Sequence, residues 1–242
     1  MIPSFEVLLA LGVVGFYLLD SAMLLYANEL VYLHARQRWS FIATTSHWQI
    51  LGRYLYLPNL LTPEKALFRV CWSAAAPNTR DDEDDGALQR LLSTVDSLRY
   101  LVHLLWVLLI IGLPLTLIMT GTGIAFLLIL GLVYGTIVAL LVQVYRKRAA
   151  LGLSARSFSK LAFDSLACAP LALNLVRKIT LLHPLTNDPI RFAKHRFDDP
   201  AFSRLVETLS QWITNELEFE DEASPRYRNL NGIKQSLTRM MS

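Results

Sequence analysis

Cysteine and charge are both scarce in this sequence of 242 residues. Cys71 and Cys168 are its only cysteines, and two such distant residues form neither a disulfide framework nor a metal-ligand spacing. Charged residues make up 18% of the chain, against about a quarter in ordinary soluble domains. The net charge of +3 is modest, and no stretch has the pattern of a nucleic-acid-binding segment. We expect a reducing compartment and no nucleic-acid partner.

The motifs of several common enzyme classes are also missing. The sequence has no nucleophile elbow, no glycine loop that cradles a phosphate, no HExxH motif and no CxxCH haem-attachment motif. No set of acid, base and nucleophile emerges from the remaining polar residues. We therefore predict no cofactor, leave the catalytic residues unassigned, and regard an enzyme as the less favoured class of function.

Long apolar runs are what the sequence does contain, with 53% hydrophobic residues and a mean hydropathy of +0.37. Three runs, over 5–26, 100–119 and 123–145, reach the roughly 20 residues that a helix needs to cross about 30 Å of hydrocarbon. Backbone groups in lipid must bond within their own segment, so each run is predicted to be a transmembrane helix. The glycine-containing turn between the last two runs predicts a helical hairpin over 100–145.

The basic residues predict how these helices are oriented. Of the 23 lysines and arginines, eight lie between Asn28 and Arg99 and fifteen between Arg146 and Ser242. None precedes the first run, and none lies in the turn of the hairpin. Because basic loops stay on the cytoplasmic side, we expect a multi-pass protein of the cell inner (cytoplasmic) membrane, with its N-terminus outside and its C-terminus in the cytoplasm.

A fourth apolar run, 161–176, is shorter and contains Asp164, Pro170 and Asn174. Proline removes a helical hydrogen bond and bends the chain. If this run crossed the membrane, the basic residues after it would face outward. We therefore predict a bent helix that lies at the membrane surface or packs under the bundle.

The cytoplasmic segment 27–99 is rich in aromatic residues. Tryptophan and tyrosine favour the headgroup region, so the segment is expected to form interfacial helices. Thr62, Pro63 and Glu64 are typical of a helix start and predict a short helix that continues to about Ser73. The aromatic residues in question are Trp39, Trp48, Tyr54, Tyr56 and Trp72.

Five consecutive acidic residues, 81–85, follow in the same segment and contain a DDxxD pattern. Carboxylates suit a hard cation, which makes Asp81, Asp82 and Asp85 candidate magnesium ligands. Such a site needs a second acidic cluster that faces the first, and none is evident. We favour a solvated loop and predict no metal site.

The cytoplasmic region 146–242 is expected to be helical and to include the surface helix 161–176. Asp199 and Pro200 predict the start of an amphipathic helix, whereas the last twenty residues are expected to be weakly ordered. Apolar residues recur on this helix at steps of three and four: Phe202, Leu205, Val206, Leu209, Trp212, Ile213 and Leu217. Basic residues near the membrane are predicted to contact lipid headgroups, namely Arg146, Lys147, Arg148, Arg177 and Lys178.

Two features inside the apolar runs point to contacts between helices. Asp20 is an ionisable residue in the first run, where it is costly unless it has a polar partner or reaches the headgroups. Gly131 and Gly135 form a GxxxG pattern, which lets another helix approach closely. We predict these three residues to be helix-packing or partner contacts.

Together these features predict an all-α integral membrane protein with three transmembrane helices and with cytoplasmic interfacial and amphipathic helices. Its expected partners are membrane lipids and other membrane protein subunits or a second copy of the chain. The favoured function is an accessory, scaffold or assembly subunit of an inner-membrane complex. The alternatives are a membrane-bound enzyme acting on a lipid-linked substrate at the cytoplasmic face, and a membrane-associated sensor or regulator.

Overall fold

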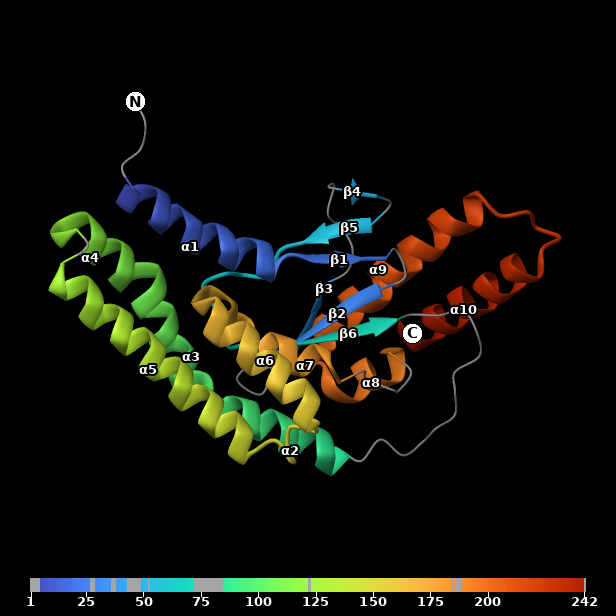
Figure 1. The fold of residues 1–242 in the computed structure, drawn as a ribbon. Helices are drawn as coiled ribbons and strands as arrows, with labels where there is room; N and C mark the ends of the chain where they lie inside the picture. Colours follow the sequence, from blue (N-terminus) through green and yellow to red (C-terminus); the bar gives the residue numbers. More distant parts are fainter. Residues whose placement is uncertain are drawn as a thin grey trace. The chain divides into compact units, whose positions relative to one another are not determined.

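The computed structural model shows a mostly helical chain that also contains two small sheets (Figure 1). The expectation of an all-α chain was therefore wrong. All structural statements below concern the residues that the structure describes, which are 5–26, 29–35, 38–42, 49–51, 53–71, 85–121, 123–183, 185 and 189–241.

The chain forms two compact units, and each is built from three segments. The first, called the helical unit here, consists of Met1–Met23, Tyr56–Ala66 and Asp84–His183. The second, called the mixed unit, consists of Leu24–Leu55, Leu67–Glu83 and Pro184–Ser242.

Seven α-helices, one π-helical segment and one 3₁₀ segment make up the described part of the helical unit (Figure 1). In chain order they are α1 (Phe5–Ser21), α2 (Asp85–Asp96), α3 (Arg99–Trp106), η1 (Val107–Gly112, π), α4 (Leu113–Thr120), α5 (Ile124–Arg146), α6 (Ala155–Ala167), η2 (Ala169–Asn174, 3₁₀) and α7 (Leu175–Leu181).

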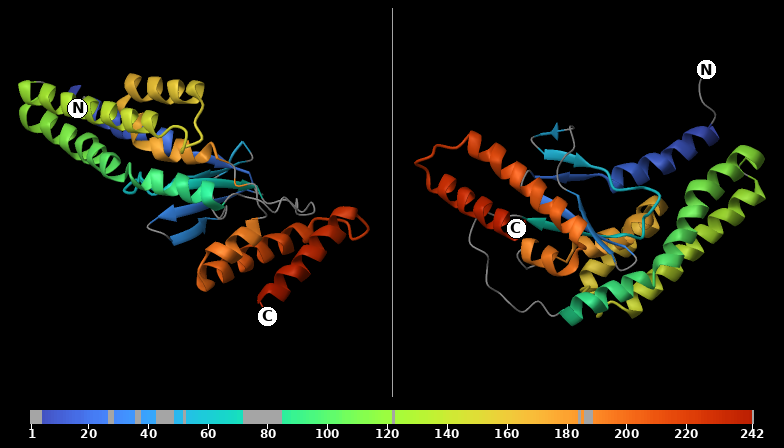
Figure 2. Two further views of the ribbon diagram at one scale, coloured as in Figure 1. Left: turned by 90° about the horizontal axis from the view of Figure 1, so that it is seen from below. Right: turned by 180° about the vertical axis from the view of Figure 1, so that it is seen from behind.

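Two helices are long and apolar enough to cross a membrane, and they form the expected hairpin. One is the helical stretch Gly86–Met119, which comprises most of α2 together with α3, η1 and most of α4, and the other is α5. They lie side by side in all views, and the turn between them contains Gly121 at a φ of +62° (Figure 2). Only 28% of the most apolar window of each helix is buried inside the structure. An apolar helix that is mostly unburied is atypical of a soluble core, so this finding supports association with a membrane.

The first of these helices changes its hydrogen-bond pattern where Pro114 approaches. Proline has no N–H and crowds the carbonyl four residues before it. In η1 the N–H of Leu113 instead bonds to the carbonyl of Leu108, five residues back. Gly112 lies in the same stretch, and a Cβ there would come within 3.2 Å of Ile129 Cδ1 on α5. The glycine therefore allows a close approach within the hairpin.

The first apolar run is a shorter helix than predicted. Residues 5–26 were expected to form it, but α1 ends at Ser21 and the strand β1 (Met23–Leu25) follows. Its 17 residues span about 26 Å, somewhat less than the hydrocarbon thickness. At this end Ser21 donates its hydroxyl to the carbonyl of Tyr17, the N–H of Ala22 bonds to the carbonyl of Leu18, and the chain then leaves the helix for the strand.

The fourth apolar run is bent, as predicted. The α-helix α6 ends at Ala167, and Pro170 lies in η2, after which the chain returns through α7. A tight turn precedes α6 and contains Gly152 at a φ of +58°. A Cβ at Gly152 would lie 2.6 Å from the ring of His183, so both the conformation and the packing of this turn require glycine.

The mixed unit contains strands where interfacial helices were expected. The strand order is β1-β5-β4 in one sheet and β3-β2-β6 in the other. In β2 and β3 the antiparallel register pairs Tyr32 with Phe41 and His34 with Trp39. The strands after β1 are β2 (Glu29–Ala35), β3 (Arg38–Ile42), β4 (Gln49–Ile50), β5 (Arg53–Tyr56) and β6 (Ala66–Cys71).

Aromatic packing explains why these segments are strands. Trp39 is buried, and its ring lies 5.6 Å from that of Phe68 and 5.0 Å from that of Phe192. Tyr32 is also buried and packs against Phe192 and Phe197. The aromatic residues therefore form a core between a sheet and a helix, a role that bulky side chains on a pleated surface favour. Trp48 and Trp72 lie outside the described residues.

The helix predicted from Thr62 to about Ser73 was wrong as well. Residues 62–65 form a turn, with the N–H of Lys65 bonded to the carbonyl of Thr62, and β6 follows. The buried run in β6 includes Phe68 and Val70, which favour strands.

The C-terminal part contains α8 (Pro189–Arg196), α9 (Asp199–Glu218) and α10 (Pro225–Met241). The cap of α9 is Asp198, one residue before the predicted position, and its carboxylate accepts from the N–H of Ala201 at 3.1 Å. The apolar stripe on α9 is confirmed in its buried members Leu205, Val206, Leu209 and Ile213. The expectation of weak order over the last twenty residues was wrong, because α10 is a helix that packs against α9.

Candidate functional site

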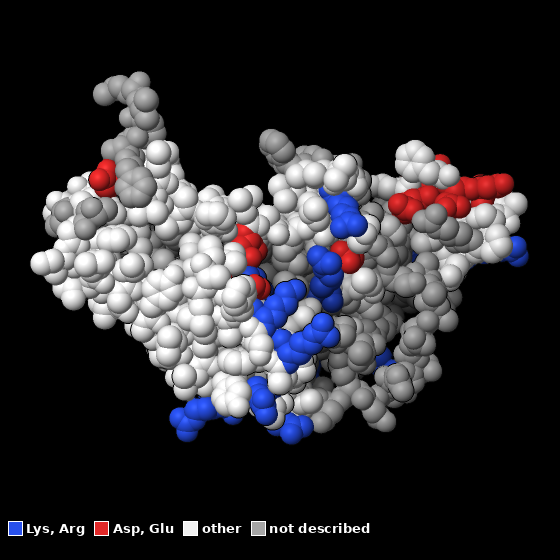
Figure 3. Space-filling view, viewed as in Figure 1, with Lys and Arg blue, Asp and Glu red and all other residues white. Residues whose placement is uncertain are grey.

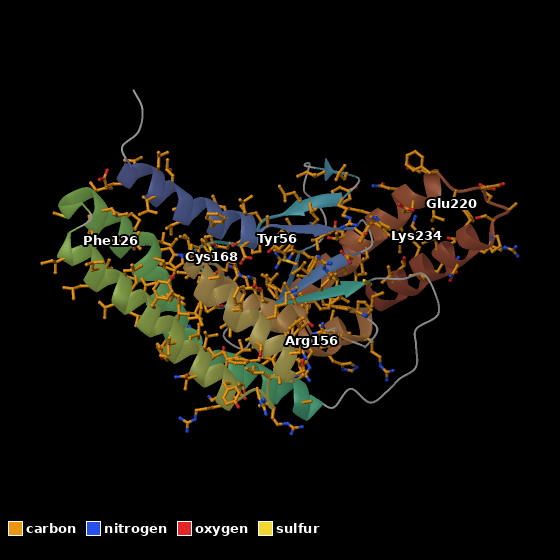
Figure 4. All side chains as sticks on the ribbon, in the orientation of Figure 1. Tyr56, Phe126, Arg156, Cys168, Glu220 and Lys234 are labelled. Carbon is orange, nitrogen blue, oxygen red and sulfur yellow. The ribbon has the colours of Figure 1, made fainter. Side chains whose placement is uncertain are left out.

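A cluster of polar side chains lies inside the helical unit, where α1, α7, η2 and the loop 57–65 meet. We call it the polar centre. It consists of Tyr17, Asp20, Ser21, Asn59, Glu64, His103, Asn174, Arg177 and Lys178. Figure 4 labels Tyr56, which lies close to the end of α1.

Arg177 on α7 is the most deeply placed charge, with only 3% of the residue exposed. It donates from Nη1 to Asn174 Oδ1 at 3.0 Å. From Nη2 it donates to the carbonyls of Asn59 and Thr62, at 2.7 and 2.9 Å. The guanidinium therefore ties the loop 57–65 to α7 through two backbone carbonyls of the loop, and a hydrogen bond from a charged donor is stronger than one from a neutral donor.

Asp20 has charged and polar partners within the chain. Its Oδ1 lies 2.8 Å from Lys178 Nζ, and its Oδ2 accepts from Asn174 Nδ2 at 2.9 Å. Asn174 also donates to the hydroxyl of Ser21 at 3.0 Å. An intramembrane or boundary carboxylate is costly unless it is paired, and Lys178 and Asn174 supply that pairing here.

The loop 57–65 makes further contacts with the helices. Its Leu60 carbonyl accepts from the Tyr17 hydroxyl at 2.7 Å and from Trp106 Nε1 at 3.0 Å. Glu64 Oε2 lies 3.7 Å from His103 Nε2, and the opposite ring nitrogen of His103 is 3.1 Å from the carbonyl of Arg99. The loop is thereby tied to both α1 and α3.

Two groups of the polar centre lack a hydrogen-bond partner among the described residues. Both Arg177 Nε and Glu64 Oε2 are buried in this state. Burial lowers the pKa of Arg177, while Tyr17, Tyr56 and Glu64 nearby oppose the shift. Burial raises the pKa of the Tyr56 phenol, and Arg177 opposes that shift. Desolvation is the larger cause at both residues, as expected for charge inside a packed structure.

The polar centre connects α1, α3, α7, η2 and the loop 57–65 through hydrogen bonds and ion pairs. Its carboxylates and cations are engaged with each other or with backbone carbonyls, and no activated nucleophile is among its members. Among the described residues, no group of three or more His, Cys, Asp and Glu side chains could hold a metal ion.

The other predicted site residues lie elsewhere. Arg146, Lys147 and Arg148 are exposed where α5 ends, and Figure 3 shows basic side chains gathered at this lower end of the helical unit. Lys147 Nζ donates to Ser97 Oγ at 2.7 Å. Headgroup binding by these three residues stays a prediction. Arg177, predicted for the same role, is placed inside the unit, and Lys178 is paired with Asp20.

Gly131 and Gly135 are on the outward face of α5. Nothing lies within 4 Å of a Cβ built at either position. The buried residues of α5 lie on the opposite face: Val133, Thr136, Ile137, Leu140, Leu141 and Val144. The glycines are therefore not used to pack the hairpin. Their role as partner contacts stays a prediction.

The acidic run is mostly outside the described part of the chain. This holds for Asp81 and Asp82, while Asp85 is the first residue of α2. The sequence interpretation missed Asn59, Glu64, His103 and Tyr17 as members of the polar centre. The sequence did mark Asn174 as unusual, because this polar residue interrupts an apolar run.

Comparison with known proteins gives no match: no family model, curated protein or solved structure is similar to the chain. Any functional assignment therefore rests on the geometry above.

Proposed function

We propose that the chain is an integral protein of the inner membrane that serves as an accessory, scaffold or assembly subunit of a larger complex. In this proposal α1, the apolar part of Gly86–Met119 and α5 cross the bilayer. The N-terminus lies outside, and both the mixed unit and the end of α5 lie in the cytoplasm. The short α1 is accommodated by local thinning of the bilayer or by flanking residues.

One contrast supports this function best. The side chains of the polar centre bond to one another inside the helical unit, whereas α4 and α5 carry large apolar side chains on their outer surfaces. Figure 3 shows that surface without charge over α4 and the upper part of α5. A unit whose polar centre is hydrogen-bonded inside it and whose outer surface is apolar is suited to contact with lipid and with other helices.

We place the contact with another helix at Gly131 and Gly135, on the outward face of α5. Without a hydrophobic driving force in lipid, helices associate through close packing, and small residues permit it. Gly131 and Gly135 lie in the middle of the exposed face of α5, between larger residues such as Leu128 and Val138. A helix of another subunit, or of a second copy, fits against this face.

Co-purification in mild detergent from native membranes tests the proposal. We expect the wild-type chain to run as a defined complex, and Gly131→Leu with Gly135→Leu to release it as a free subunit. Ala125→Leu is the matched control, because Ala125 is also small and exposed on α5 but lies outside the glycine pair. A wild-type chain that purifies as a solitary monomer, or a complex that tolerates both leucines, contradicts the proposed function.

A further inference from the structure

The segment from α6 through η2 to α7 begins and ends at the same place in the helical unit, beside residues 151 and 152. Its two ends meet where His183, just after α7, lies beside the turn before α6, with His183 Nε2 2.7 Å from the carbonyl of Leu151. The same ring packs against Gly152. The segment 153–182 is therefore a hairpin with a closed base.

The hairpin runs back along α5. Near its base, the Phe158 ring lies 5.3 Å from the ring of Tyr145, in the last turn of α5. From there α6 continues in the direction opposite to α5, as all ribbon views show (Figures 1 and 2). In Figure 4, Arg156 and Cys168 mark the two ends of α6, and Cys168 is the one nearer Phe126 at the start of α5. The nine helical steps from Phe158 to Ala167 advance about 14 Å, less than half of a hydrocarbon core.

The exposed side chains of α6 change character along this path. At its beginning they are Arg156, Ser159 and Lys160. One turn later the most exposed large side chains are apolar, Phe163 at 73% and Leu166 at 43%, and the part-exposed Asp164 lies between them in the sequence. Basic residues favour anionic headgroups, and apolar residues favour acyl chains. Along α6 the basic residues come first and the large apolar residues second. A segment that enters a leaflet from the cytoplasm likewise meets the headgroups first and the acyl chains second.

The tip of the hairpin is the 3₁₀ segment η2. Backbone that is not α-helical is tolerated at membrane depth only where protein buries it, and η2 is buried in this way. The 3₁₀ segment η2 contacts α1, α3 and α5. Its buried residues are Ala169, Pro170, Ala172, Leu173 and Asn174. Lipid therefore meets only the outer face of α6 and not the backbone of the tip.

The returning limb explains the charge in α1. Lys178 on α7 reaches Asp20, and Arg177 bonds to Asn174 and to the loop 57–65. The two basic residues of the returning limb, Arg177 and Lys178, therefore both have partners near the end of α1. An unpaired Asp20 at that level would be costly.

We propose that residues 153–182 form a re-entrant hairpin that enters the bilayer from the cytoplasmic side and returns to it. On α6, Phe163 and Leu166 face acyl chains, while Arg156 and Lys160 face the headgroups of anionic lipids. This inference rests on the spanning role proposed for α5, and it places the segment deeper than the surface helix that its sequence predicts.

Fluorescence quenching in reconstituted vesicles tests the proposal. The full chain, with Cys71→Ser and Cys168→Ser, carries one cysteine at a time in place of Ser159, Phe163 or Val138, labelled with an environment-sensitive dye. The vesicles contain phosphatidylcholine and phosphatidylglycerol, with or without brominated acyl chains, and iodide is the aqueous quencher. Leu166→Cys is a second reporter if the Phe163 variant does not fold.

The three positions separate the outcomes. We expect brominated lipid to quench and blue-shift the dye at Phe163 and at Val138 on α5, and iodide to quench the dye at Ser159. Iodide quenching at Phe163 with lipid quenching at Val138 overturns the re-entrant hairpin but leaves the span. Iodide quenching at Val138 overturns the span and the hairpin that depends on it. A dye at Phe163 that neither quencher reaches shows that protein covers α6, which also overturns the proposal.

Discussion

At the scale of single residues, the pair Asp20–Lys178 shows how the chain tolerates charge beside apolar helices. Both side chains are partly buried, with 16% and 25% of their surfaces exposed, and their charged atoms are 2.8 Å apart. Removing one partner leaves the other desolvated and uncompensated, which costs more than removing both.

A double-mutant cycle measures this dependence. We expect Asp20→Ala and Lys178→Ala each to destabilise the purified protein, and the double variant to be less destabilised than the sum. Partners in direct contact couple by about 0.5–3 kcal/mol. The measurement is unfolding of the detergent-solubilised protein by heat or denaturant. Asp20→Ala with Lys160→Ala is the control, because Lys160 is an exposed lysine of the same unit and is expected not to couple. Full additivity for Asp20 and Lys178 contradicts the pairing.

At the scale of elements, the turn between α5 and α6 decides whether the chain can double back. Its backbone at Gly152 has a positive φ, and the ring of His183 occupies the space of a Cβ. A side chain at this position meets a conformational cost and a steric one. The same contact closes the base of the hairpin, so the turn and the hairpin are stabilised together.

We expect Gly152→Ala to destabilise the helical unit, because a left-handed conformation alone costs an L-residue about 1–2 kcal/mol. Adding His183→Ala removes the collision and recovers part of the loss, although it also removes the bond to Leu151. Unfolding of the two single variants and the double variant measures this. A double variant that loses the full sum of both single effects contradicts the role of the ring contact.

The accuracy of the sequence predictions also differs from element to element. The runs 100–119 and 123–145 are apolar over their whole lengths, and such runs specify helices by themselves. The strands β2 and β3 were missed because Trp39 and Phe41 alternate over only five residues, and their aromatic content also suits a membrane interface. Short patterns are decided by tertiary packing, here against Phe68 and Phe192.

The polar centre could be predicted only in part. Asp20 and Asn174 stand out because each interrupts an apolar run. Their contact joins residues 154 positions apart, and the bonds of Arg177 to the loop 57–65 go to backbone carbonyls, which carry no sequence signal. Glu64 was assigned to a helix start, so its place opposite His103 was not predictable.

At the scale of the whole molecule, the topology of the helical unit decides both proposals. The helical unit carries exposed apolar side chains along α4 and α5 and basic residues at the end of α5. The accessory function and the re-entrant hairpin both require that α5 crosses the membrane with Arg146 on the cytoplasmic side. They also require that the chain does not cross again after it.

Reporter fusions at three positions test that topology most directly. Alkaline phosphatase is active only outside the cytoplasm, and green fluorescent protein reports the cytoplasmic side. We expect phosphatase activity for a fusion after Gly121, in the turn of the hairpin, and fluorescence without phosphatase activity for fusions after Arg148 and after Ser242. Phosphatase activity after Ser242 would show a further crossing, and its absence after Gly121 would show that the hairpin does not cross. Either result contradicts the proposed topology.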